Sequence, residues 1–264
     1  MQRSLEAYER AGNRVRQAAL LSDLGVICHW EGRWEEAFTY WERSRYESLK
    51  IGSTMSASAA RVNVAEIMVD RGEWGDAEAA LLETLPFWRA SQFRLFLAAC
   101  LSLLGRASLR LGRLDQARSR LEEAKATFIE VGAEQEVPSM DARLAECLLA
   151  AGDAQGALDA VNALQARLKD SGAAARVAPL VERIKGHALL AQGDLWSARD
   201  ALEASLAAAR EQANSFEAAL TVLSLIELDR LEGVEPPLEM VSEARMVMSN
   251  LKVRAVPPVP LPAQ

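Results

Sequence analysis

The chain has few of the residues that build β-sheets and disulfide frameworks. It contains three cysteines without a CxxC pair, three tyrosines and six phenylalanines in 264 residues, and runs of β-branched residues are almost absent. These scarcities argue against a sheet. Cys28, Cys100 and Cys147 each lie in an apolar stretch, so we expect buried free thiols in a reducing compartment.

Positive charge, long apolar runs and catalytic motifs are also lacking. The formal charge of −7 argues against a nucleic-acid or anionic-membrane surface, and no apolar run approaches the ~20 residues of a membrane span. The motifs GxxxxGK[ST], GxGxxG, HExxH and GxSxG are absent. We therefore expect a soluble, cytoplasmic chain that is not an enzyme and holds no cofactor or metal.

What the chain does contain is a repeat. One ladder of glycines has a spacing of 40 residues, stretched once to 41: Gly32, Gly72, Gly112, Gly152, Gly193 and Gly233. A second ladder, in which Gln92 takes one place, comprises Gly12, Gly52, Gly132 and Gly172. An alanine follows each of the first five glycines by five residues, at Ala37, Ala77, Ala117, Ala157 and Ala198. Such regularity predicts a repeat architecture.

Each unit reads as a pair of helices. Segments such as LLSDLGVICHWEG space apolar residues three and four apart and stop at a glycine, which is typical of an amphipathic helix. A second helix is expected to start about two residues later and to run some 17 residues to the other ladder. Small residues at Gly25 and Ala37 allow close approach within the pair. Because each pair leaves an apolar face bare, the pairs should stack into a solenoid.

Prolines refine the predicted helix limits. Pro138 suits the first turn of a first helix, and Pro236 and Pro237 suit that of a last second helix. Pro86 predicts a kink or early break, and Pro179 predicts a late start for its helix. The proline-rich residues 254–264 should form an extended, mobile tail, with a ligand for a proline-recognition domain as the alternative.

The repeat resembles the tetratricopeptide repeat (TPR). In the first unit the matching positions are Leu21, Leu24, Gly25, Gly32, Trp34 and Ala37. The 40-residue repeats are longer than is usual for this family. Such long repeats look like those in the C-terminal helical regions of bacterial adenylate or guanylate cyclase–ATPase proteins and STAND-type regulators, on stretches such as VAEIMVDRGEWGDAE and LGRASLRLGR. The resemblance implies an all-α fold, a right-handed superhelical α-solenoid, whose inner surface is lined by first helices. Any cyclase or ATPase activity would lie in other domains.

We expect a single solenoid over residues 1–253, with a half repeat at 1–13. The predicted repeats are about 14–52, 53–92, 93–132, 133–172, 173–213 and 214–251. SLEAYERAG reads as the back half of a second helix whose partner is missing. The hypothesis is that more protein lay upstream, and bare solenoid ends would favour self-association.

Counting from Gly25 gives the candidate binding positions on the inner surface: Ser22, Val26, His29, Trp30, Glu66, Asp70, Arg106, Arg110, Glu146, Arg183 and His187. Residues at the same position in successive repeats form what we call a column. One column comprises Glu66, Arg106, Glu146 and His187, and it places opposite or titratable charges side by side. It indicates either a polar groove for a peptide or a ladder of inter-repeat salt bridges, and we favour the ladder.

The tryptophans differ in the kind of residue found at the same position of the other repeats. Trp34 and Trp41 stand in apolar columns and should pack in the core. Trp30 stands in a column that holds Asp70 and Arg110, so it either forms an exposed patch or covers its neighbour.

The expected function is a scaffold that binds a protein or peptide, or relays a signal from upstream domains of the same polypeptide. The alternative is a peptide or small-molecule sensor whose ligand sits in the concave groove. A closed apolar pocket near Trp30 would favour the sensor, and an open polar channel would favour the scaffold.

Overall fold

The computed structural model describes residues 2–169 and 171–262, which fold into α-helices and a single 3-10 turn without a strand. The helices are α1 (Gln2–Arg10), α2 (Arg14–Trp30), α3 (Trp34–Lys50), α4 (Thr54–Asp70), α5 (Trp74–Ala90), α6 (Arg94–Arg110), α7 (Leu114–Glu130), α8 (Val137–Ala150), α9 (Ala154–Leu168), α10 (Gly172–Ala191), α11 (Leu195–Glu211), α12 (Ser215–Leu231) and α13 (Leu238–Asn250), with η1 (Glu134–Glu136) before α8. Within this part of the chain no helix is long and apolar enough to cross a membrane.

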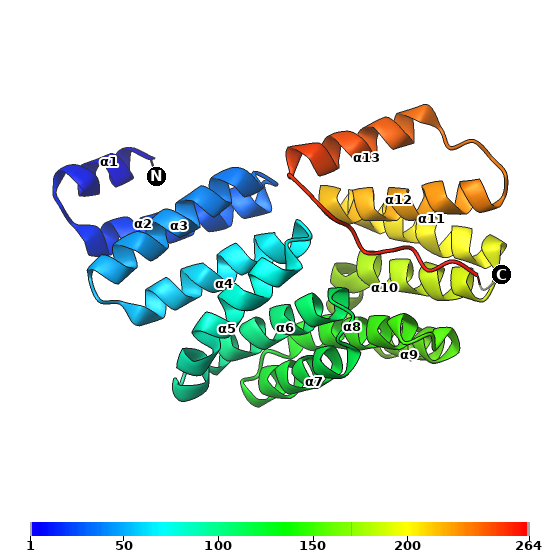
Figure 1. Ribbon diagram of the computed structural model, residues 1–264, viewed down its shortest axis with the longest axis horizontal. Helices are drawn as coiled ribbons and strands as arrows, with labels where there is room; N and C mark the ends of the chain where they lie inside the picture. The colour runs from blue at the N-terminus through cyan, green and yellow to red at the C-terminus, as the bar shows by residue number, and fades with distance from the viewer. Residues whose placement is uncertain (1, 170, 263–264) are drawn as a thin grey trace.

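Successive helices pack side by side into a right-handed superhelix, so the predicted all-α solenoid is confirmed (Figure 1). Helices end where the glycine ladders predicted. Gly32 and Gly72 follow α2 and α4 with φ of 73° and 81°, the left-handed region in which a residue with a Cβ is strained.

The first pair shows why a small residue stands in the middle of each first helix. A Cβ built on Gly25 would overlap the indole of Trp41, whose Nε1 donates a hydrogen bond to the Ser22 carbonyl at 3.1 Å. Trp34 and Trp41 are buried, which confirms packing as their role. The three cysteines are also buried free thiols, as expected.

Two prolines do not interrupt their helices. Of the kink or early break expected at Pro86, the early break does not occur, because α5 continues to Ala90; Pro86 is exposed, so water reaches the carbonyl that loses its partner. The expected late start at Pro179 is also wrong, because α10 begins at Gly172. The carbonyl of Ala175, four residues before Pro179, accepts a 2.6 Å hydrogen bond from Gln212 instead.

Three further prolines lie at or just before helix starts. Pro138 occupies the first turn of α8, which confirms the prediction. Pro237 is the N-cap of α13, so Pro236 and Pro237 precede that helix instead of forming its first turn. Proline at the boundary still fits, since it lacks the N–H that a helix start leaves unpaired.

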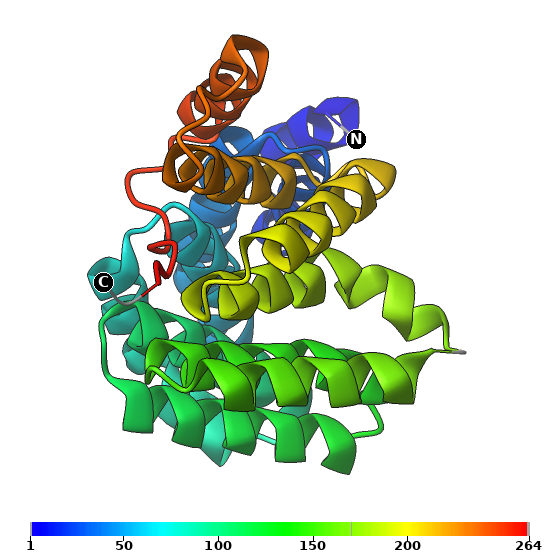
Figure 2. The same cartoon turned by 90° about the vertical axis from the view of Figure 1, so that its right-hand side faces the viewer.

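The superhelix curls until its last helices meet its first ones (Figure 2). Phe216 at the start of α12 packs edge-on against Trp34, with ring centroids 5.0 Å apart. Leu251 is 4% exposed and belongs to the apolar cluster of Cys28, Trp34 and Val64. This contact between the two ends, which we call the seam, encloses the inner surface.

Candidate functional site

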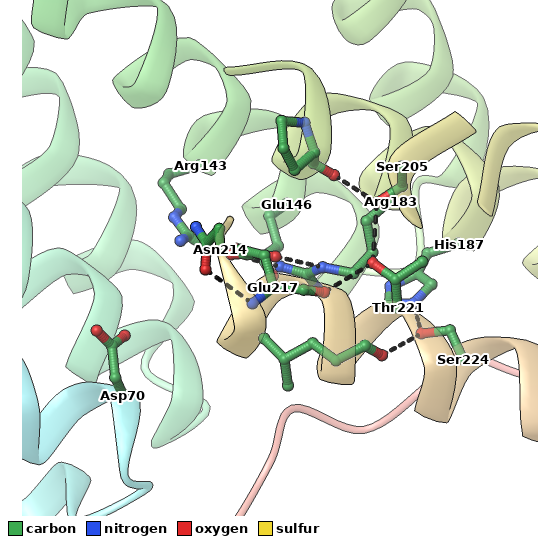
Figure 3. Close-up of polar contacts among 12 residues, drawn as sticks. Asp70, Arg143, Glu146, Arg183, His187, Ser205, Asn214, Glu217, Thr221 and Ser224 are labelled. Atoms are coloured by element: carbon green, nitrogen blue, oxygen red, sulfur yellow. Dashed lines mark hydrogen bonds and ion pairs between the residues drawn. The ribbon is translucent and has the colours of Figure 1, made fainter. Parts of the chain in front are cut away.

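Ion pairs line the centre of the inner surface. We call this set the inner ion-pair network: Asp70, Arg106, Arg110, Arg143, Glu146, Arg183 and Glu217. Its pairs link α4 to α6, α6 to α8, and α10 to α12, and Figure 3 shows part of it. Arg106 pairs with Asp70. Glu146 accepts from Arg110 at 2.6 Å and from Arg143 at 2.9 Å.

The pairs lie one helical turn away from the predicted columns. Glu66, Arg106 and Glu146 were expected to pair side by side, but Arg106 bonds Asp70 and Glu146 bonds Arg110. This diagonal pairing is still the geometry of an inter-repeat salt-bridge ladder. Two residues four apart on a helix share a face, so a neighbouring arginine reaches either of them.

Charge alternation ends at His187. Burial, together with the nearby Arg183 guanidinium, lowers the pKa of His187 to about 3, and the neutral ring shares a 2.7 Å hydrogen bond with the Ser224 hydroxyl. His187 therefore takes no part in an ion pair at neutral pH.

Glu146 and Glu217 of the network are charged despite their burial. Burial acts to raise the pKa of Glu146, but the Arg110 and Arg143 guanidinium groups outweigh it and hold that pKa well below its ordinary value. Arg183, 2% exposed, donates to Glu217 at 3.0 Å, and the pKa of Glu217 is likewise lowered, since Arg183 and Arg143 outweigh its burial. The network is a rigid, ionised centre.

A cavity of about 580 Å³ opens beside this network, between α2, α4, α6, α8 and the start of α12. We call it the central cavity. Its lining is His29, Trp30, Glu31, Gly32, Trp34, Glu66, Asp70, Arg106, Arg143, Gln212, Ala213, Asn214, Ser215, Phe216 and Glu217. The lining is largely polar.

Glu66 is the exception among the acids of the central cavity. Asp70 and Glu217 are paired with arginines and Glu31 with Arg33, whereas Glu66 has no hydrogen-bond or ion-pair partner in the described part of the chain. Burial raises the pKa of Glu66, and His29 opposes that effect. An uncompensated carboxylate in a cavity favours a cationic ligand.

Trp30 lies on the rim of the same cavity with 83% of its surface exposed. Of the two alternatives for this residue, exposure is the one observed. His29 stacks on the buried Trp34 at 6.1 Å between ring centroids. Trp30 therefore presents an exposed indole in the cavity that Glu66 also lines, and an indole face attracts cations.

The predicted positions fall into four groups. His29, Trp30, Glu66, Asp70 and Arg106 line the central cavity. Arg110, Glu146 and Arg183 belong to the inner ion-pair network, and His187 lies beside the C-terminal tail. Ser22 and Val26 are half-buried and do not line the cavity.

Sequence reasoning missed Arg143 and Glu217. Glu217 stands in the first turn of α12, and the register had not been carried into that sixth first helix. Extending the same period into α12 gives Leu223 and Glu227 as its inward positions, so Glu217 would still have been missed. Arg143 was missed because it lies one residue away from the inward position of its helix.

The comparisons with known proteins agree with this architecture. A tetratricopeptide repeat profile matches residues 56–130, and a comparison with curated protein sequences finds no match. Among solved structures the chain is similar to the Rap conjugation gene regulator of the plasmid pLS20 in complex with the Phr* peptide, at 15% identity and a TM-score of 0.69, covering 92% of this chain and 66% of that chain. The chain thus spans just under two thirds of that regulator's length.

Two further structures share the fold. The apo form of RapI is 14% identical, with a TM-score of 0.67, over 93% of this chain and 89% of that chain. The TPR-like repeats of a putative kinesin light chain from Podosopora anserina are 18% identical, with a TM-score of 0.54, over 74% of this chain and 96% of that chain. At such identities the likeness establishes a TPR-like solenoid and nothing finer.

Proposed function

We propose that this chain is a non-catalytic scaffold that binds a segment of a protein partner in the central cavity. A basic side chain of the partner lies between the Glu66 carboxylate and the Trp30 indole. The observation that carries the proposal is the unpaired carboxylate of Glu66 in a cavity whose other acids are paired. A lysine or arginine would complete the ion pair that the fold leaves open.

The character of the cavity supports a scaffold over a small-molecule sensor. Its lining is polar and its rim carries an exposed tryptophan, as in surfaces that recognise peptides. The similar pLS20 regulator was solved with a peptide bound, which supports the same class of ligand here.

The partner is a separate protein or another domain of the same polypeptide. The resemblance to the helical regions of cyclase–ATPase and STAND-type regulators supports the second arrangement, in which the solenoid relays a signal within a larger bacterial regulatory protein in the cytoplasm. Self-association through the solenoid ends stays a prediction.

The test uses two capped, fluorescently labelled pentapeptides, Ala-Ala-Arg-Ala-Ala and Ala-Ala-Glu-Ala-Ala, titrated with the full chain and followed by anisotropy. We expect the arginine peptide to bind at least about ten times more tightly than the glutamate peptide, since only the cation pairs with Glu66. Glu66→Gln should abolish that preference, and Trp30→Ala should weaken binding of the arginine peptide.

The matched control is Glu203→Gln, which removes an exposed acid on α11 that is not part of the cavity lining. It should leave both affinities unchanged. Equal binding of the arginine peptide by the wild type and by Glu66→Gln, with both proteins folded by circular dichroism, would refute the proposal.

A further inference from the structure

The C-terminal tail does not leave the molecule after α13. Expected from the sequence to be mobile, it turns back and runs along the inner side of α12 (Figure 1). The Arg71 side chain donates to the Leu251 carbonyl at 2.9 Å, and the Arg254 N–H donates to the Arg71 carbonyl at 2.7 Å. Lys252 and Arg254 add ion pairs with Glu35 and Glu73.

Gly72 provides the closest backbone approach to the tail. A Cβ built on Gly72 would overlap the backbone of Ala255, whereas one built on Gly112, which has a similar positive φ, would meet open space. At this point the turn after α4 accommodates the tail only because residue 72 has no side chain.

Beyond this anchor the tail is extended and presents one side to the helices. Val253, Ala255, Pro257 and Val259 are half-buried, while the residues between them are exposed. This period of two is that of an extended chain, and the prolines lock it in that shape without an internal hydrogen bond.

The surface under the tail is formed by α10 and α12. It comprises Arg183, His187, Leu220, Leu223, Ser224 and Glu227. Val259 also packs against the apolar cluster that contains Leu189 and Leu228. A cavity of about 260 Å³ remains between the tail and these helices, so the tail does not fill the space above them completely.

We propose that this surface of α10 and α12 is a docking site for an extended, proline-rich peptide with apolar side chains at alternate positions. Residues 253–261 are its resident occupant. A partner segment of the same chemistry binds there by displacing the tail. This site is separate from the central cavity, whose lining includes no residue of the tail.

The contacts of the resident tail indicate that another peptide can displace it. Its alternate residues are only half-buried, and a cavity lies beneath it. Because it is tethered, however, it acts at an effective concentration in the millimolar range. A free peptide therefore competes poorly until the tail is weakened.

The experiment titrates a labelled synthetic peptide of residues 252–264 against three full-length chains: wild type, Val259→Asp and Leu95→Asp. An aspartate at 259 would lie against the apolar cluster and displace the tail, whereas Leu95 of α6 is 51% exposed, lies outside the tail and the surface under it, and serves as the matched control. We expect Val259→Asp to bind the peptide at least about tenfold more tightly than the wild type or Leu95→Asp. A peptide that itself carries Val259→Asp should not bind.

A second pair of variants tests the anchor without altering the tail. Gly72→Ala combines backbone strain with a clash against Ala255, and Gly112→Ala has the strain alone. Gly72→Ala should bind the peptide more tightly than Gly112→Ala. Equal or undetectable binding by folded Val259→Asp and wild type would overturn the proposal. So would a wild-type dimer in light scattering that dissociates in Val259→Asp, because it would assign the surface to the tail of a second copy.

Discussion

At the scale of single residues, the inner surface is defined by buried charge that is nearly all compensated. Removing charges from water is costly, and a buried ion pair repays that cost only when its geometry is good. Glu146 satisfies this condition by accepting from two arginines, and Arg183 by donating to Glu217. The compensated groups form the rigid frame against which the uncompensated Glu66 stands out.

His187 gives the residue-scale prediction, a pH dependence of stability. Its pKa is about 3 in the folded chain and about 6.5 unfolded. Between these values the unfolded state binds the extra proton, so stability falls as pH decreases through this window. We expect His187→Gln, which keeps a hydrogen-bonding group near Ser224, to lose less stability than the wild type between pH 6.5 and 5.

The measurement is the free energy of unfolding by urea at several pH values in this window. The difference between wild type and variant isolates the contribution of His187, since the carboxylates of the network are common to both. If the two curves run parallel throughout the window, a buried neutral imidazole at this position is contradicted.

The sequence predicted which residues face inward better than it predicted what they bond. The forty-residue register placed Asp70, Arg106 and Arg110 on the inner surface, because side-chain direction follows helical geometry. It did not predict that Arg106 bonds Asp70 instead of Glu66. That choice depends on the offset between neighbouring helices, which side-chain volume and packing decide.

At the scale of helices, close approach within a pair depends on a residue without a side chain. Gly25→Ala should destabilise the chain by about 1–3 kcal/mol, because the added methyl overlaps the indole of Trp41 in a packed core. Gly75→Ala is the control, since its Cβ would meet open space; it should be neutral or stabilising by up to about 1 kcal/mol.

Urea unfolding followed by circular dichroism measures both changes. A loss for Gly75→Ala as large as that for Gly25→Ala would show that the cost is not the contact with Trp41.

Helix limits were largely predictable, except at the two prolines inside helices, Pro86 and Pro179. Glycine ends a helix by its own backbone conformation, so Gly32 and Gly72 could be read locally. Proline inside a helix is tolerated when the freed carbonyl finds another partner. Gln212 supplies that partner for Ala175 from the next helix. The sequence around Pro179 contains no local pattern that predicts this hydrogen bond.

At the scale of the whole molecule, the decisive feature is the closure of the superhelix on itself. The period predicted a solenoid, but the degree of curl follows from the small rotation between repeats, which accumulates over the stack. The contact of Phe216 with Trp34 and the position of the tail on α10 and α12 both depend on this accumulated rotation. They were therefore beyond the reach of sequence patterns.

Closure gives the last prediction. Leu251 is nearly fully buried in the seam, and its neighbours Cys28, Trp34 and Val64 belong to the opposite end of the chain. Leu251→Ala should weaken the seam by about 2–5 kcal/mol. The helix pairs do not depend on this contact, because each packs mainly on its sequence neighbours, so helicity should be retained while the radius of gyration in X-ray scattering increases.

The same variant connects closure to binding. The start of α12, with Phe216 and Glu217, forms one wall of the central cavity, and the seam holds that wall opposite Trp30. Leu251→Ala should therefore also weaken binding of the arginine pentapeptide. Met246→Asp, which alters a residue of α13 that is 60% exposed, should change neither measurement. An unchanged radius of gyration together with weakened binding would mean that Leu251 acts on the cavity by a route other than closure.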